Sequence, residues 1–198
     1  MKRMCLAVLV LAGSAAFSAP AEFIDLDFEY GSPGMGPRHW YHGGEGFTII
    51  LTDDSPRSGA LCLLMEKTDP ASEGFGVATS KLPLDRARGK TVTFTGWIRT
   101  EGVRDGYAGL WMRVDGTDGH IAFDNMGDRG VTGDTEWTQY TIELPVDEAE
   151  ATNVVFGCLM PASGKAWFDD FAITLDGEAF EQDPPVVWVL TEVQLDWI

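Results

Sequence analysis

The chain has 198 residues, of which 44% are hydrophobic and 23% charged, a composition that suits one globular domain with a sizeable core. Its formal net charge of -17 argues against binding to nucleic acid or to anionic membranes, because both depend on clustered Lys and Arg. Neutral ligands and divalent cations are compatible with this charge.

The first 21 residues have the organisation of an export signal. Lys2 and Arg3 form a basic start, an apolar run follows, and Ala19-Pro20-Ala21 gives an A-x-A cleavage pattern. The apolar run is shorter than the ~20 residues that a membrane-spanning helix needs. We therefore expect a cleaved signal peptide over 1–21, a mature chain in the periplasm or outside the cell, and no membrane insertion.

The rest of the chain reads as short apolar or alternating segments separated by Gly and Asp, a pattern typical of all-β proteins. Only two stretches, 84–90 and 146–152, are helix-like, and both are short. This pattern predicts an all-β fold, a two-sheet sandwich, over residues 22–178. The predicted strands are 22–29, 47–52, 60–67, 75–82, 91–100, 108–115, 120–126, 138–146, 152–160 and 165–176.

Two features leave alternatives open. The segment 179–198 is an acidic linker followed by an apolar run, and it is either an extra edge strand or the start of a further domain. Cys62 and Cys158 lie in separate apolar strand-like runs. They either form a disulfide, which an exported protein permits, or remain buried free thiols.

Two neighbouring predicted strands carry the same unusual pattern. Successive side chains of a strand point to opposite faces, so Trp97 and Arg99 lie opposite the aliphatic residues of the first strand. Trp111 and Arg113 lie opposite the aliphatic residues of the second. The pattern predicts a Trp/Arg face that contacts a ligand, or a second small core that the chain covers with its own loop or tail.

Other candidate ligand residues lie near this pattern in the sequence. His120 and Asp124 alternate with apolar residues and are expected on the same sheet face. Trp40 and Tyr41 lie in a segment that precedes a glycine pair and are expected at the rim of a site.

No catalytic group is predicted. There is no G-x-S-x-G motif around the serines, and only three histidines are available as a general base. Asp169 and Asp170 are adjacent in a predicted strand, so they point to opposite faces and cannot act as a glycosidase pair. We therefore expect a protein that is not an enzyme.

Several motifs resemble known domains. "LDFEYG", "SGALCLLME", "GKTVTFTGWIRTE" and "GKAWFDDFAITLDG" are similar to the ordered landmarks of galactose-binding-like jelly-roll sandwiches, the fold of many carbohydrate-binding modules. "GYAGLWMRVDG" and "VVFGCLMPASGKAWFDD" resemble accessory sandwich domains that precede catalytic domains in secreted bacterial hydrolases, such as processing-type serine peptidases and erythromycin-esterase-like proteins.

This resemblance implies a structural calcium ion, held by Glu29 of the first-strand "FE" and by Asp169 and Asp170 of the last-strand "DD". It also implies that the tryptophans stack on the rings of a carbohydrate or glycan while the arginines donate hydrogen bonds to it. The alternative is a structural or protein-interaction domain that docks on a hydrolase domain or other protein partner without binding sugar.

Overall fold

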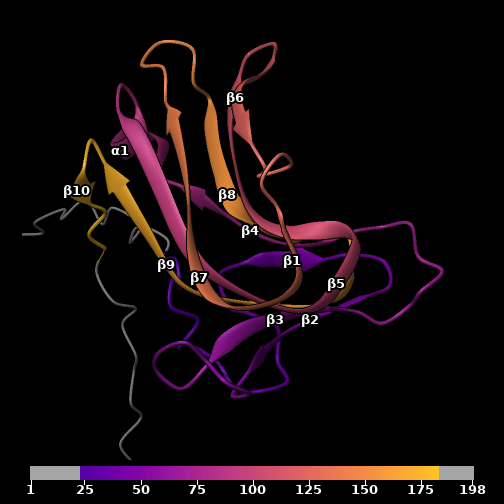
Figure 1. Ribbon diagram of the computed structural model, residues 1–198. Helices are drawn as coiled ribbons and strands as arrows, with labels where there is room; N and C mark the ends of the chain where they lie inside the picture. Colours follow the sequence, from indigo (N-terminus) through magenta and orange to yellow (C-terminus); the bar gives the residue numbers. More distant parts are fainter. Residues whose placement is uncertain (1–22, 183–198) are drawn as a thin grey trace, which may run out of the picture.

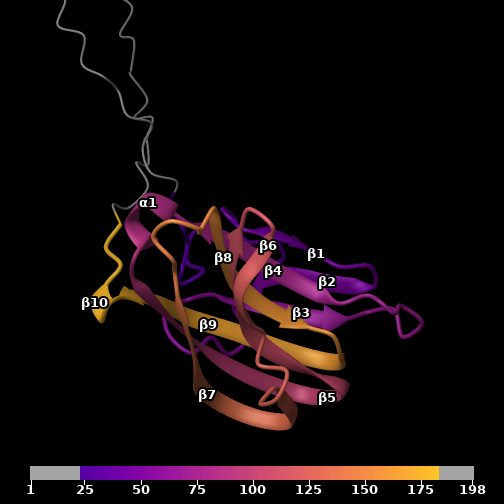
Figure 2. The same cartoon turned by 90° about the horizontal axis from the view of Figure 1, so that it is seen from above.

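Two antiparallel sheets face each other in residues 23–182, the part of the chain that the computed structural model describes (Figure 1, Figure 2). Sheet A has the strand order β1-β4-β8-β5-β6, and sheet B has the order β2-β3-β9-β5-β7 with β10 paired to β9. The elements are β1 (Tyr41–Gly43), β2 (Phe47–Thr52), β3 (Cys62–Lys67), β4 (Gly76–Leu82), α1 (Leu84–Ala87), β5 (Thr91–Gly116), β6 (Gly119–Asp124), β7 (Val131–Pro145), β8 (Asn153–Met160), β9 (Ser163–Leu175) and β10 (Glu178–Ala179). The predicted all-β sandwich is confirmed.

Strand β5 belongs to both sheets. Its first half pairs with β7 and β9 in sheet B, and its second half pairs with β6 and β8 in sheet A. Between the halves the register shifts repeatedly, and Asp105 takes a positive φ of 59°. Figure 1 shows the ribbon of β5 bending near its label as it passes from one sheet to the other.

The core lies between the two sheets and is rich in aromatic rings. The Phe94 ring lies 5.0 Å from that of Phe156 and 5.1 Å from that of Phe171, measured between centroids, in edge-to-face arrangements. Such pairs stabilise a core beyond the area that they bury. All the residues predicted for this core are buried except Tyr140, which packs against it partly buried: Val92, Phe94, Ile98, Leu110, Met112, Val114, Ile142 and Phe171.

The strand predictions were correct for most of the sheet and wrong at its N-terminal end. Of the predicted strand 22–29, the described residues 23–29 form no regular strand, because the chain turns at Phe28, which has a φ of 60°, and the Asp25 carboxylate accepts the Tyr30 amide. The predicted strands 91–100 and 108–115 are one continuous strand. The short strands β1 and β10 were not predicted, since neither is long enough to show an alternating pattern.

The cysteines and the two terminal segments are the remaining features predicted from the sequence. The two cysteines are buried free thiols, with Cys62 in sheet B and Cys158 in sheet A. Among residues 23–182, no helix is long and apolar enough to cross a membrane. The predicted signal peptide lies outside the described residues, as does all of the C-terminal segment beyond Gln182.

Asp25 is a fully buried carboxyl beneath the N-terminal segment. One of its carboxylate oxygens accepts the Tyr30 amide at 3.1 Å, and its backbone carbonyl accepts the Trp40 indole N–H at 2.8 Å. Burial and the neighbouring Asp27 side chain raise the pKa of Asp25 from 3.8 to about 7. The folded state therefore favours the neutral form of this carboxyl.

The raised pKa predicts that Asp25 opposes folding at high pH. Its favourable contribution to the free energy of unfolding is complete below the unfolded pKa of about 4 and is lost as the pH rises through about 7. Asp25→Asn keeps the acceptor for Tyr30 and removes the titration. We expect it to match the parent at pH 4 and to be more stable at pH 8 by an amount on the order of a few kcal/mol in urea unfolding. The control is Asp53→Asn at an exposed position, and equal pH slopes for parent and Asp25→Asn would contradict the assignment.

Candidate functional site: an aromatic groove on sheet A

A groove of about 490 Å³ lies on the outer face of sheet A. Its floor comes from adjacent strands. Tyr41 on β1 pairs with Thr79 on β4, Thr79 pairs with Gly157 on β8, and Gly157 pairs with Trp111 on β5. The lining residues are Tyr41, Phe75, Val77, Thr79, Tyr107, Trp111, Arg113, Phe123, Asn125, Leu159 and Pro161.

Gly157 on β8 lies between two strands that carry lining residues of the groove, since it pairs with Thr79 on β4 and with Trp111 on β5. An added Cβ at this position would lie 2.0 Å from the carbonyl oxygen of Ala78, so the close approach of β8 to β4 requires glycine. The glycine therefore permits the spacing of the strands beneath the groove.

Exposed aromatic rings gather in this groove. Of the described aromatic residues, three are strongly exposed: Tyr41 at 71%, Phe75 at 52% and Phe123 at 47%. All three line the groove. Leaving large apolar rings in water in one place is unusual for a soluble protein and is typical of a binding surface.

The polar groups of the groove are few. Arg113 reaches it from β5, but its Nε lies 2.7 Å from a carboxylate oxygen of Asp115, so its charge is already compensated. Asp115 is held in turn by the Asn153 amide at 3.0 Å. None of the lining residues carries a carboxylate. The groove therefore presents apolar rings and hydrogen-bonding groups without a net charge.

The structure places the two Trp/Arg pairs on opposite faces of the molecule. Trp111 and Arg113 lie in the groove on sheet A, whereas Trp97 and Arg99 lie on the outer face of sheet B. The Arg57 guanidinium sits 3.8 Å from the Trp97 ring centre, and that of Arg99 sits 4.6 Å from the ring centre of Trp167. The pair on sheet B is therefore occupied by cation–π contacts within the chain.

The other predicted ligand residues are divided between groove and interior. Tyr41 lines the groove, but Trp40 is buried in the core, where its ring lies 5.4 Å from that of Phe28. His120 is exposed on β6 outside the lining, and the Asp124 carboxylate is engaged by Arg129. The structure thus brings only Trp111, Arg113 and Tyr41 of the predicted set into the groove.

Sequence reasoning missed Phe123 because it inverted the faces of β6. It put the apolar residues of 120–126 toward the core, as an alternating strand usually does. In the structure Ala122 pairs with buried Val114, while Phe123 pairs with Arg113 and points outward. Phe75 and Asn125 flank the ends of β4 and β6, and Tyr107 lies where β5 bends and its register shifts, so no alternating pattern signals the direction of these side chains.

The three carboxylates predicted for calcium converge on the segment between β2 and β3. Glu29 accepts the backbone amides of Ala60 and Leu61 at 2.9 and 3.0 Å. Asp169 accepts the Arg57 amide at 2.8 Å, and Asp170 forms an ion pair with the Arg57 guanidinium. Within residues 23–182 no group of three His, Cys, Asp or Glu side chains has the arrangement of a metal site.

Calcium therefore remains a prediction for this segment, supported by the convergence of the carboxylates and opposed by the protein donors that already engage them. If the ion binds the folded state only, free calcium at 100 times its dissociation constant adds about 2.7 kcal/mol to the free energy of unfolding. The measurement is a thermal melt with millimolar calcium against one with chelator, with Asp170→Asn as the variant. Superimposable parent curves would remove calcium from this site.

The sequence of the chain was compared with family models and with curated proteins. No family model matches the chain. An uncharacterized HTH-type transcriptional regulator, YbfP of Bacillus subtilis (strain 168), is 38% identical over 96 residues, which are 48% of this chain and 32% of the regulator. The chain thus spans about a third of the length of this relative.

Two solved structures are similar over most of the chain. One is the CBM22-1 xylan-binding domain from Paenibacillus barcinonensis Xyn10C, with a TM-score of 0.56 at 14% identity over 82% of this chain and 100% of that domain. The other is a cyclase from Fischerella sp. TAU, with a TM-score of 0.55 at 12% identity over 78% of this chain and 96% of that one. At these identities the likeness concerns the fold alone. The chain is an all-β antiparallel sandwich that resembles the jelly roll of family 22 carbohydrate-binding modules.

Proposed function

We propose that this chain is an exported, non-catalytic module that binds neutral carbohydrate in the groove on sheet A. One observation carries the proposal: the three strongly exposed aromatic residues of the described chain all line a single groove. The apolar faces of sugar rings stack on aromatic side chains, and hydroxyl groups at the ring edges find hydrogen-bond partners in Arg113, Asn125 and Thr79.

The electrostatics favour a neutral ligand. The formal charge of the whole chain is -17, and the one cation of the groove lining is paired with Asp115. An anionic polymer would meet overall repulsion without an uncompensated cation to bind it. The same charge speaks against nucleic acid as a ligand, despite the partial similarity to an HTH-type regulator.

The chemistry of the lining supports binding rather than catalysis. Glycoside hydrolysis generally uses a pair of carboxyl groups across the scissile bond, and the groove lining has none. The likeness to a xylan-binding domain points the same way. A structural or docking role as an accessory domain of a hydrolase is the other candidate, and it is supported by the exposure of a further apolar side chain, Ile121, two residues before Phe123 on β6.

The test compares aromatic residues on the two sheets. Tyr41→Ala and Phe123→Ala remove exposed rings of the groove, so each should weaken binding to soluble xylan about tenfold while the denaturation midpoint stays within error of the parent. Trp97→Ala is the matched control, because the Trp97 ring lies on sheet B, outside the groove, and forms a cation–π contact with Arg57. It should lower the midpoint and leave the dissociation constant unchanged. Calorimetry and urea unfolding give the two quantities.

The proposal fails if the parent binds neither soluble xylan nor any neutral glycan of an array. It also fails if Trp97→Ala abolishes binding while the two groove variants bind as the parent does. Capture of a hydrolase domain that survives in the presence of excess glycan would favour the docking role.

Export is a separate part of the proposal. The organisation of residues 1–21 predicts that the exported protein begins between Ala19 and Glu22. Intact-mass spectrometry of protein recovered from the periplasm or medium measures this start. An exported protein that retains Met1 would contradict the assignment.

A further inference from the structure

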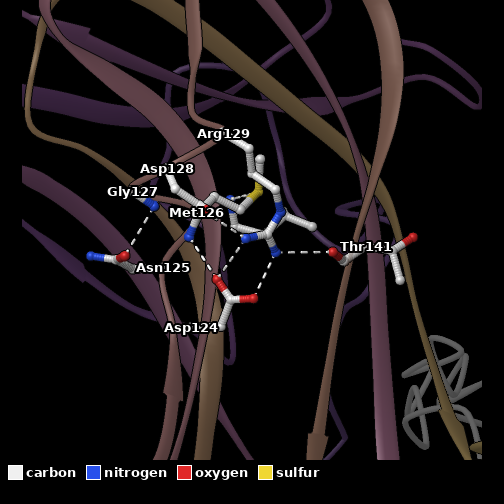
Figure 3. A network of polar contacts seen from close by, with 8 residues as sticks. Asp124, Asn125, Met126, Gly127, Asp128, Arg129 and Thr141 are labelled. Atoms are coloured by element: carbon white, nitrogen blue, oxygen red, sulfur yellow. Dashed lines mark hydrogen bonds and ion pairs between the residues drawn. The ribbon is translucent and has the colours of Figure 1, made fainter.

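The connection between β6 and β7 forms one end of the groove and is held by a dense polar network (Figure 3). Asp124 accepts two hydrogen bonds from the Arg129 guanidinium, at 3.1 Å and 2.6 Å, and one from the Met126 amide at 2.8 Å. Arg129 also donates to the carbonyl oxygen of Thr141 on β7. The two-point contact fixes the plane of the guanidinium and ties the connection to both flanking strands.

The ion pair is maintained at neutral pH. Burial alone would raise the pKa of Asp124, but the hydrogen bonds from Arg129 and from the Met126 amide hold that pKa below its ordinary value. Both partners are thus charged, and their attraction stabilises this conformation of the connection.

Met126 anchors the connection from inside. Its side chain is fully buried although its φ is 59°, a conformation that costs free energy for a residue with a side chain. Its sulfur accepts the buried amide of Leu110 at 3.2 Å. The tip of the connection is therefore pinned to β5 directly beneath the groove.

This fixed connection determines how Asn125 faces the groove. The Asn125 side-chain oxygen accepts the Gly127 amide at 3.1 Å, so the oxygen is occupied and the NH2 group points away from the ion pair, as Figure 3 shows. Asn125 lines the groove beside Tyr107. The Tyr107 ring packs directly on the backbone of the same connection, since a Cβ added at Gly130 would lie 2.3 Å from it.

We propose that Asn125 is a specificity-determining residue whose NH2 group donates hydrogen bonds to an acceptor oxygen of the bound sugar, and that the Asp124–Arg129 pair is the device that positions it. The inference rests on the proposed carbohydrate binding. It adds a requirement that stacking alone does not impose: the ligand must present an acceptor oxygen at the β6–β7 end of the groove when its ring lies on the aromatic side chains.

The decisive variant is Asn125→Asp. An aspartate has nearly the same shape and retains the acceptor for the Gly127 amide, so the connection keeps its conformation, but it has no NH2 group to donate. We expect its affinity for soluble xylan, or for the best neutral glycan of an array if xylan is not bound, to fall at least tenfold. Asn125→Ala should lose about as much. Thr117→Asp, at the exposed turn between β5 and β6, controls for the added negative charge and should bind as the parent does.

The positioning role is tested by a double-mutant cycle. Arg129→Ala should weaken binding of the parent several-fold and should speed hydrogen exchange at the Leu110 and Gly127 amides. In the Asn125→Ala background the same change should have no further effect on affinity, because the group that it positions is already gone. A purely structural role of Arg129 would weaken binding equally in both backgrounds.

The outcomes separate this inference from the proposed function. If the parent binds glycan and both Asn125→Asp and Asn125→Ala bind it as tightly as the parent does, the inference about Asn125 is wrong but the proposed carbohydrate binding is retained. Equal losses on Arg129→Ala in both backgrounds overturn the positioning role alone. If the parent binds no neutral glycan, the proposed function falls and this inference falls with it.

Discussion

Strand β5 passes from one sheet to the other, and this crossing sets how the two sheets enclose the core and which surfaces they present. A strand of 26 residues contributes its even-numbered side chains to the interior along both halves, including Phe94 and Ile98 in sheet B and Leu110 and Met112 in sheet A. Because the two sheets enclose the core from opposite sides, the odd-numbered side chains of the two halves point out of the molecule in opposite directions. The crossing thus joins the sheets and divides the Trp/Arg pattern between two surfaces.

The outer faces of the two sheets differ in how far their aromatic rings are covered by other side chains. On sheet B, the segment between β2 and β3 brings Arg57 over Trp97, and the Asp170 carboxylate holds that arginine in place. A ring covered by a paired cation contributes to stability and leaves little surface for a ligand. On sheet A, the Arg113 guanidinium lies farther from the Trp111 ring centre, at 6.0 Å, and the nearby rings of Tyr41, Phe75 and Phe123 remain in contact with water.

The charges near the groove are arranged to cancel. Arg113, which lines the groove, pairs with Asp115, and Arg129 in the adjoining connection pairs with Asp124. In a chain with a formal charge of -17, local neutrality of this kind lowers the repulsion that any oxygen-rich ligand would meet. It also leaves neutral hydrogen-bonding groups in the lining, such as the amide of Asn125, which suit an uncharged ligand.

The class of the fold, most of the strands and nearly all of the core follow from the sequence, because alternation at a period of two is a local property of each strand. The sequence also identified three residues of the candidate site, Tyr41, Trp111 and Arg113. The sequence could not show that 91–100 and 108–115 are one strand that changes sheets. Even-numbered residues are buried on both sides of the bend, so the alternating pattern is the same in both halves and does not mark the change of sheet.

Which outward-facing side chains lie together depends on contacts between segments that are distant in sequence. Trp97 was separated from Trp111 by the crossing of β5, Trp40 was drawn into the core by its contacts with Phe28 and Phe171, and Phe123 was turned outward by its pairing with Arg113. Asn125 acquired its direction from an ion pair and a buried methionine in a connection without any periodic pattern. The alternating pattern of a strand specifies which of its side chains are buried. The contacts of the outward-facing side chains depend on other strands and loops, which are distant in sequence.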